Sequence, residues 1–252
     1  METKKEDLMK DQDYIAEVLK WKEPYPCRAF AEVPEDKRAD IIQHARMLIT
    51  EDMDNWDQMY VIEAFIKTSI SDRANIVYHA QTFAVTGMTG WNWAWVISAL
   101  TWVSADDRAE LIRRVQVLLT KDMSALNRAC VLHALARIPL VDRTEFIQQI
   151  QALVTKNMNG EEQALVIDLL ANAPRNERVN IIQHAQTLMT NGMTGEEQAY
   201  VIRAFAWMLV DGRIELVRYV QALAVVDMDD RRRYLVIDAL AQVIATSNRR
   251  EF

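Results

Sequence analysis

The sequence predicts an all-α protein, a right-handed α-α superhelix in which helix–turn–helix units stack side by side as a solenoid. Three observations lead to this fold class. A methionine, followed eight residues later by a valine and then by Ile or Leu, recurs every 35 residues with no insertion or deletion. The apolar residues of each unit have the spacing of amphipathic helices. Glycine and proline number only 6 and 5 among 252 residues, and a period of this length is typical of units that bury their apolar faces against their neighbours.

The repeat is written six times along the chain. The methionines that mark it are Met53, Met88, Met123, Met158, Met193 and Met228. We expect six 35-residue units over residues 36–247, each with two helices and short turns. Residues 1–35 would form an N-terminal cap with a degenerate half-repeat, because a bare terminal unit would leave apolar surface in water. Residues 248–252 would be a C-terminal tail or the start of a truncated seventh repeat.

Capping residues predict where the helices begin, because Ser, Thr, Asp and Asn side chains accept hydrogen bonds from the first backbone N–H groups of a helix. The second helix of each unit is expected to start at Asp54, Thr89, Ser124, Asn159, Thr194 and Asp229. The first helix is expected to start at Asp36, Ser71, Asp106, Val141, Asn176 and Asp211. We interpret Pro34, Pro139 and Pro174 as marking the end of a second helix.

Other polar residues recur in nearly every unit and are therefore assigned to the scaffold. We expect the recurring arginines to bind helix-end carbonyl groups of the adjoining unit, and the recurring glutamines to form hydrogen bonds between units. These residues are Arg38, Arg73, Arg108, Arg143, Arg178 and Arg213, with Gln81, Gln116, Gln151, Gln186 and Gln221. His44, His79 and His184 share one repeat position, at least one repeat apart, so we expect no metal site.

Four positions of the second helix vary between units, spaced i, i+4, i+7 and i+11. On a helix they share one face, opposite the repeated Val and Phe or Leu positions, and stacking would align them as a variable stripe along the concave surface. Exposed Trp and Tyr side chains often carry interface energy, so an aromatic anchor is expected in repeats one and two. The predicted partner-binding residues are Trp56, Tyr60, Glu63, Lys67, Trp91, Trp95, Trp102, His133, Arg137, Tyr200, Arg203 and Trp207.

The alternative interpretation of this stripe is that solvent tolerates any residue there and that the aromatic residues pack against the N-terminal cap. Trp93 lies nearer the core side of its helix and is expected to be structural.

No catalytic motif is present: the sequence contains no HExxH, paired CxxC, Walker, GxGxxG or GxSxG pattern. We therefore expect no enzyme activity, no catalytic or metal-binding residue and no cofactor. The net charge of −7 gives no general attraction to nucleic acid or to anionic membranes. The charged start of the chain and the absence of long apolar runs predict a cytoplasmic protein without membrane association, and we expect a monomer.

The helix-pair plan resembles the α-solenoid group that includes tetratricopeptide, pentatricopeptide and HEAT repeats. The unit length equals the pentatricopeptide period, and the segment from Gly192 and Met193 to Tyr200 is similar to that family's turn and first helix. The resemblance covers residues 36–247 as architecture and implies binding along a concave surface. It carries over no family-specific residue.

Two functions follow from these observations. The leading hypothesis is a non-enzymatic scaffold that binds another protein or a peptide segment along the variable stripe. The alternative is a modular protein that binds single-stranded RNA, with one base read per repeat and bases stacked on aromatic side chains. We rank the alternative second because the chain is acidic and the stripe mixes charges of both signs.

Overall fold

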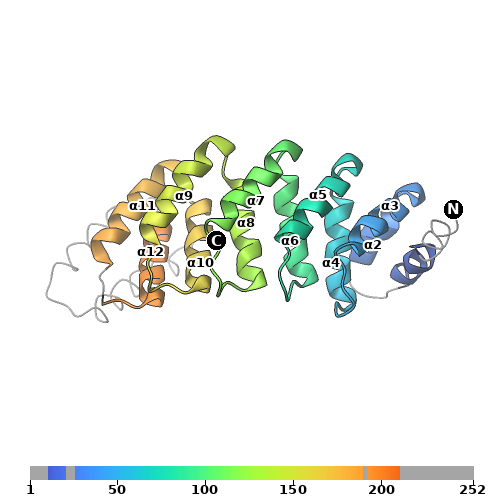
Figure 1. The fold of residues 1–252 in the computed structure, drawn as a ribbon, viewed down its shortest axis with the longest axis horizontal. Coiled ribbons are helices and arrows are strands. Elements are labelled where there is room, and N and C mark those ends of the chain that lie inside the picture. The colour runs from blue at the N-terminus through green and yellow to red at the C-terminus, as the bar shows by residue number, and fades with distance from the viewer. Residues whose placement is uncertain (1–10, 21–25, 190–191, 211–252) are drawn as a thin grey trace, which may run out of the picture. The chain divides into compact units, whose positions relative to one another are not determined.

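The computed structural model describes residues 11–20, 26–189 and 192–210, without the side chains of residues 26–27 and 207–210. Every regular element in these ranges is helical (Figure 1). The elements are residues 11–18, α2 (Pro26–Glu32), α3 (Glu35–Arg46), α4 (Asn55–Ile66), α5 (Ile70–Phe83), α6 (Gly90–Thr101), η1 (Ala105–Asp107), α7 (Arg108–Gln116), α8 (Ala125–Arg137), η2 (Leu140–Asp142), α9 (Arg143–Leu153), α10 (Gly160–Asn172), α11 (Arg175–Leu188) and α12 (Gly195–Val210).

The chain forms two compact units. The first comprises residues 1–117 and 128–136, and the second comprises residues 118–127 and 137–252. Within the first unit, α4 packs on α2, α3 and α6, and α5 packs on α3, α6 and α7. Figure 1 shows α3 and α5 in one layer of this unit and α4 and α6 in a second layer. Each helix thus contacts its sequence neighbour and the next helix but one, which is consistent with a helical repeat.

The second unit has the same plan. Helix α11 packs on α9 and α12, and α10 packs on α12. The predicted sixth repeat and C-terminal tail, residues 211–252, lie outside the described residues.

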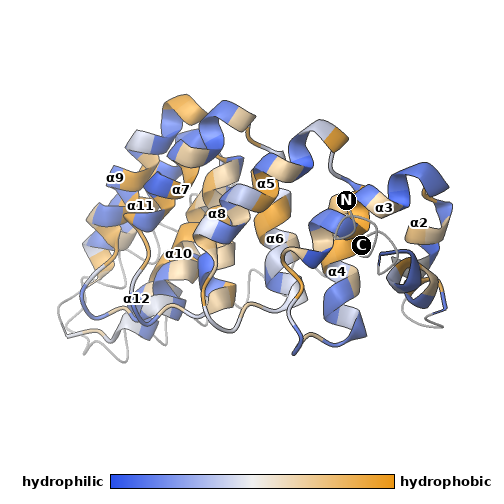
Figure 2. Ribbon diagram, turned by 45° about the vertical axis from the view of Figure 1, so that its right-hand side comes forward, coloured by the Kyte–Doolittle hydropathy of each residue, from blue (hydrophilic) through white to orange (hydrophobic). Residues whose placement is uncertain are grey.

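The repeated apolar positions form the core of each unit, as predicted. In the five described repeats the marker methionines are buried, and the valines and the Phe or Leu residues of the second helices are fully buried. The fully buried residues are Val61, Val96, Val131, Val166 and Val201, with Phe65, Leu100, Leu135, Leu170 and Phe205. Figure 2 shows apolar residues where α4, α5 and α6 meet and hydrophilic residues at the loops.

The predicted starts of the second helices are confirmed in the five repeats that the structure describes. Asp54 and Ser124 each accept a hydrogen bond from the backbone N–H three residues ahead. Thr89, Asn159 and Thr194 do the same, and the side chain of the third helical residue returns a bond to the cap's own N–H. These reciprocal capping boxes define the first turn of the helices that carry the variable stripe. Asp229 lies outside the described residues.

The predicted starts of the first helices are wrong by one or two residues in the five described repeats, and the sixth, at Asp211, lies outside the described residues. Helices α3, α5 and α11 have Pro34, Ser69 and Pro174 as N-caps, and none of these caps makes a side-chain capping bond. Proline suits this position because its fixed φ matches the conformation before a helix and its missing N–H group is not needed there. In the two repeats that start at Ala105 and Leu140, a 3-10 turn precedes the α-helix.

The arginine prediction is confirmed for the five described arginines, and the glutamine prediction is confirmed for Gln81 and Gln186 but not for Gln116 and Gln151. The Nε atoms of Arg108, Arg143 and Arg178 donate to the carbonyl groups of Leu100, Ile138 and Leu170 at 2.9–3.0 Å. Arg38 and Arg73 likewise bind carbonyl groups that precede their own helix. The glutamine amides of Gln81 and Gln186 donate to the carbonyl groups of Met47 and Ala152 on the preceding first helix.

The N-terminal helix, residues 11–18, packs on the first repeat. Ile15 and Val18 are buried, the Tyr14 hydroxyl donates to Gln58 of α4, and Arg46 of α3 forms an ion pair with Asp11 at 2.5 Å. Burial, with a smaller contribution from the Glu17 carboxylate, raises the pKa of Tyr14 to about 12.

Among the described helices, none is long and apolar enough to span a bilayer. The described residues also contain no cluster of three His, Cys, Asp or Glu side chains that could hold a metal ion.

Candidate functional site

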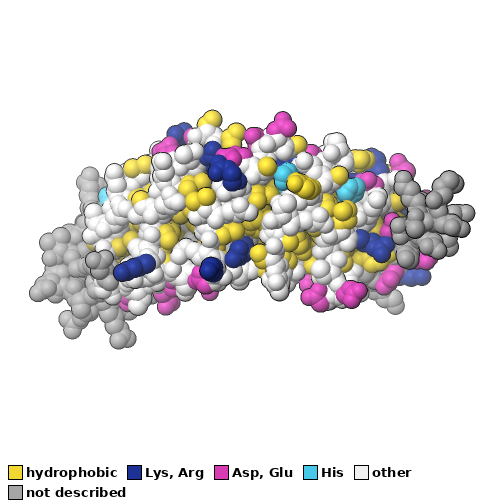
Figure 3. Space-filling view, in the orientation of Figure 1, with side chains coloured by type: hydrophobic (Ala, Val, Ile, Leu, Met, Phe, Trp, Pro, Cys, Tyr) yellow, Lys and Arg dark blue, Asp and Glu magenta, His cyan; other side chains and the backbone are white. Residues whose placement is uncertain are grey.

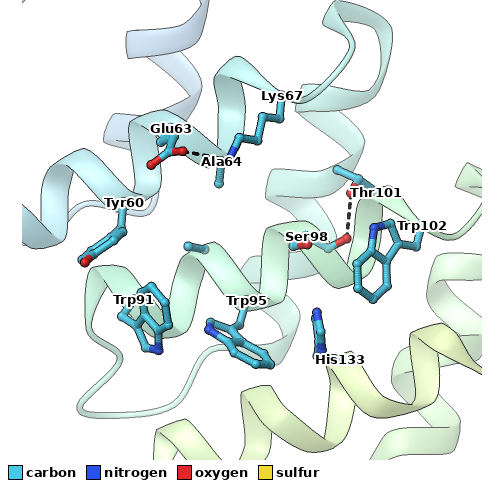
Figure 4. Close-up of a pocket in the computed structure, with 11 residues that line it drawn as sticks. Tyr60, Glu63, Ala64, Lys67, Trp91, Trp95, Ser98, Thr101, Trp102 and His133 are labelled. Carbon is cyan, nitrogen blue, oxygen red and sulfur yellow. Dashed lines mark hydrogen bonds and ion pairs between the residues drawn. The ribbon is translucent and has the colours of Figure 1, made fainter. Parts of the chain in front are cut away.

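The variable positions of α4 and α6 lie on the side of each helix opposite the core. Val61 and Phe65 of α4, like Val96 and Leu100 of α6, are fully buried, so residues about half a turn away are directed out of the unit. The exposed sides of these two helices, together with His133 of α8, line an open groove of about 570 Å³ in the first unit (Figure 4).

We call this surface the aromatic groove. Its lining residues are Tyr60, Glu63, Ala64 and Lys67 of α4, Trp91, Ala94, Trp95, Ser98, Thr101 and Trp102 of α6, and His133 of α8. Seven of them belong to the predicted partner-binding set: Tyr60, Glu63, Lys67, Trp91, Trp95, Trp102 and His133.

Five aromatic rings of the groove contact one another in series. The ring centroids of Tyr60 and Trp91 are 4.9 Å apart, and those of Trp91 and Trp95 are 6.1 Å apart, both in edge-on geometry. The His133 ring lies 4.3 Å from the Trp95 ring and 4.5 Å from the Trp102 ring, and Figure 4 shows it between them. Edge-on and tilted contacts at these separations are favourable, so the rings hold one another in place along the groove.

The rings nevertheless remain accessible to solvent. Trp91 is 45% exposed and Trp102 is 52% exposed, whereas Tyr60, Trp95 and His133 are half-buried. Trp93, by contrast, is 5% exposed, as the sequence predicts for a structural residue. Trp91 contacts the rings of Tyr60 and Trp95. Trp95 and Trp102 each contact the ring of His133.

The two permanently charged side chains of the groove form a pair. Lys67 Nζ lies 2.7 Å from Glu63 Oε1, one turn apart on α4. The ammonium is largely exposed and the carboxylate half-buried, so the pair stabilises the helix little but neutralises this end of the groove.

Trp56 lies outside this groove. It is 49% exposed in the first turn of α4, one turn before Tyr60. Its position on the same helix face makes it an extension of the stripe toward the helix N-terminus.

In the second unit the stripe is mainly ionic. Arg137 forms an ion pair with Asp168 at 2.5 Å and a hydrogen bond with Asn172, both on α10. The Arg203 guanidinium lies 3.9 Å from the Tyr200 ring centroid on α12. These five residues therefore have intramolecular partners, and the side chain of Trp207 lies outside the described residues.

A second, smaller pocket of about 280 Å³ lies between α10 and α12. Its lining includes Leu165, Tyr200 and three carboxylates, those of Glu161, Glu162 and Glu196. Glu162 and Glu197 serve as capping residues for these helices, so part of the acidic character of this region comes from helix capping.

Sequence reasoning missed four residues of the aromatic groove. Ala64 and Ala94 line the groove between the rings, where a small side chain leaves room. Ser98 and Thr101 complete the wall on α6. The position of Ser98 in the variable stripe was a usable signal, whereas nothing in the repeat pattern singles out Thr101.

On the face shown in Figure 3, basic and acidic side chains are interspersed with uncharged ones in each unit. The distinctive feature of the aromatic groove is its row of contacting rings. Its two permanently charged side chains have opposite charges.

No protein-family model matches this chain, and no curated protein or solved structure is significantly similar to it. Function has to be inferred from the site itself.

Proposed function

We propose that this protein is a non-enzymatic scaffold that binds a segment of another protein or a peptide along the aromatic groove. The observation that carries the proposal is the half-exposure of Trp91 and Trp102 within one row of contacting rings. Clustered exposed tryptophans are costly in water and are enriched at the energetic centres of interfaces. Mutual ring contacts also reduce the entropy that these side chains lose on binding.

The wider architecture belongs to the same proposal. Six 35-residue units wound as a right-handed superhelix would continue the stripe beyond the groove and let Trp56, Tyr200, Arg203 and Trp207 contribute. The proposed scaffold is monomeric and cytoplasmic and uses no cofactor.

A nucleic-acid function has less support. Bases could stack on the groove's rings, but binding to phosphates relies on unpaired basic side chains. Lys67 is paired with Glu63, and the chain carries a net charge of −7.

The test compares what the intact protein and two groove variants capture from a cell lysate, with bound proteins quantified by mass spectrometry. The variants are Trp91→Ala and Trp102→Ala, whose circular dichroism and thermal unfolding must match those of the parent. Proteins bound through the groove should be depleted by about tenfold or more in each variant, because truncating an interface tryptophan typically costs at least ~1.4–2 kcal/mol.

The matched control is Tyr78→Ala, since Tyr78 is an exposed aromatic residue on α5 that does not line the groove. Its capture profile should equal that of the parent. Equal capture by the parent and both folded tryptophan variants would contradict the proposal, and captured RNA that disappears with the same variants would favour the nucleic-acid alternative.

A further inference from the structure

The aromatic groove offers many hydrogen-bond donors. Among the described residues, no acceptor binds the indole nitrogens of Trp91, Trp95 or Trp102, although all three side chains line the groove. An indole N–H is a donor only, and a tryptophan at an interface usually finds a partner for it. A ligand that fills this groove should therefore supply acceptors.

The groove also has no net charge from its permanently charged side chains. Glu63 and Lys67 neutralise each other at 2.7 Å, so neither an acidic nor a basic segment gains an unpaired counter-ion. Charge complementarity favours an uncharged ligand, because a buried ion without a partner is strongly destabilising.

The spacing of the tryptophans on α6 defines the shape of the ligand. Trp91, Trp95 and Trp102 lie on one face of α6 and its C-terminal cap, with axial offsets of about 6 Å and about 10 Å at 1.5 Å per residue. A polyproline II segment rises 3.1 Å per residue, so residues two apart are separated by about 6 Å and residues one turn apart by about 9 Å. The row thus matches a short extended segment of that geometry.

We propose that the aromatic groove binds a proline-rich segment in the polyproline II conformation. Its proline rings pack between the tryptophan faces, and its backbone carbonyl groups accept hydrogen bonds from the indole N–H groups. Such a segment is uncharged, has no internal hydrogen bonds and presents solvated carbonyl groups, which complements a groove rich in rings and donors. This inference rests on the proposed function and specifies the chemistry of the partner.

Other segments fit the same groove less well. An arginine-rich peptide could place guanidinium groups on the rings, but its N–H donors would meet the indole donors and a carboxylate that Lys67 already occupies. An amphipathic helix satisfies its own carbonyl groups and would leave the indole donors without acceptors.

The experiment titrates isotope-labelled protein with decaproline and follows the indole N–H signals by nuclear magnetic resonance. The signals are assigned from Trp→Phe variants. Those of Trp91, Trp95 and Trp102 should shift in a saturable manner, whereas the signal of the buried Trp93 should stay unchanged. A glycine–serine peptide of equal length should produce no shift, because it lacks both the rings and the preformed conformation.

Two variants separate hydrogen bonding from ring contact. Trp102→Phe keeps an aromatic face and removes the donor, so decaproline affinity should fall by about twofold to tenfold, the effect of one hydrogen bond. Trp102→Ala removes both and should reduce it by about tenfold or more. Tyr78→Ala should leave the affinity unchanged.

Unchanged groove signals at the highest soluble decaproline concentration would overturn the inference. So would a stronger response to oligoarginine or to oligothymidylate than to decaproline. If decaproline fails while lysate capture still depends on Trp91 and Trp102, only the chemistry of the segment is wrong. If capture is independent of both residues, the proposed function itself fails.

Discussion

At the residue scale, Arg108 on α7 shows how the recurring arginines hold consecutive helices together. Its side chain is 2% exposed, and its guanidinium donates to the Leu100 carbonyl at 2.9 Å, to Asn75 Oδ1 at 2.7 Å and to Asp72 Oδ1 at 3.1 Å. One side chain thus links the end of α6 to α5. A buried cation is tolerated here because each of its nitrogens has an acceptor.

Replacing Arg108 with methionine should lower the free energy of unfolding by about 2–4 kcal/mol, because the carbonyl and carboxylate that it binds lose a buried partner. Urea denaturation followed by circular dichroism measures this. The control is Arg113→Met on the same helix, since Arg113 is mostly exposed and pairs with Glu110. It should change the midpoint little, and equal losses in both variants would contradict the structural role of Arg108.

The residues of the site were predictable where helix periodicity determines them. Tyr60, Trp91, Trp95 and Trp102 share the face opposite the buried valines, and this follows from residue spacing. The contact of His133 with two tryptophan rings depends on the distance between α6 and α8. The pairing of Arg137 with Asp168 depends on the distance between α8 and α10. Repeat spacing does not determine either distance.

At the element scale, glycine at the first position of a second helix allows two repeats to approach closely. This residue occurs two positions after the marker methionine in three repeats, as Gly90, Gly160 and Gly195. A Cβ atom on Gly160 would lie 2.7–2.8 Å from the backbone of Met123, and the Gly160 N–H donates to Asp122 Oδ2 at 2.6 Å. The repeats therefore contact each other backbone to backbone at this point.

Gly160→Ala should consequently lower the free energy of unfolding by about 1–3 kcal/mol through steric overlap, although alanine favours helix by about 1 kcal/mol. Differential scanning calorimetry would show a reduced melting temperature. The matched control is Ala125→Gly, at the same repeat position in α8. There the main expected effect is the lower helix propensity of glycine. A higher melting temperature for Gly160→Ala would contradict the close approach.

The element boundaries show why some parts of the fold were predictable and others were not. The second helices begin at side chains that accept backbone N–H groups, such as Asp54 and Thr89, and this chemistry is visible in the sequence. The first helices begin after Pro34 or Pro174, or through a 3-10 turn at Ala105. None of these starts has a side chain that caps the helix, so the preference for Ser, Thr, Asp or Asn caps does not locate them.

At the scale of the whole molecule, each unit has a histidine at the same repeat position that is shielded from solvent: His79 is buried and His184 is half-buried. Burial lowers the pKa of His79, with a further contribution from the nearby Arg108 cation, and burial also lowers the pKa of His184. The pKa of each histidine is therefore lower in the folded state than in the unfolded chain, where the histidine pKa is about 6.5.

This predicts a loss of stability in weak acid. Above pH ~6.5 both states have neutral histidines, and as the pH falls below that value the unfolded state binds protons first, so the free energy of unfolding decreases. Urea denaturation from about pH 7.5 to about pH 5.5, a range in which carboxylates remain largely ionised, measures the effect. In a His79→Gln, His184→Gln variant the decrease should be smaller, and an undiminished decrease would assign it to other groups.

We propose the row of rings on α4, α6 and α8 as the surface that recognises a linear protein segment. The most direct measurement is selection of random linear peptides displayed on phage against the intact protein, followed by binding assays of each enriched peptide with Trp91→Ala and Trp102→Ala. Enriched peptides should bind the parent, lose about tenfold or more affinity in both variants, and retain affinity for Tyr78→Ala. Enriched peptides that bind all four proteins equally, or a selection that enriches none, would contradict it.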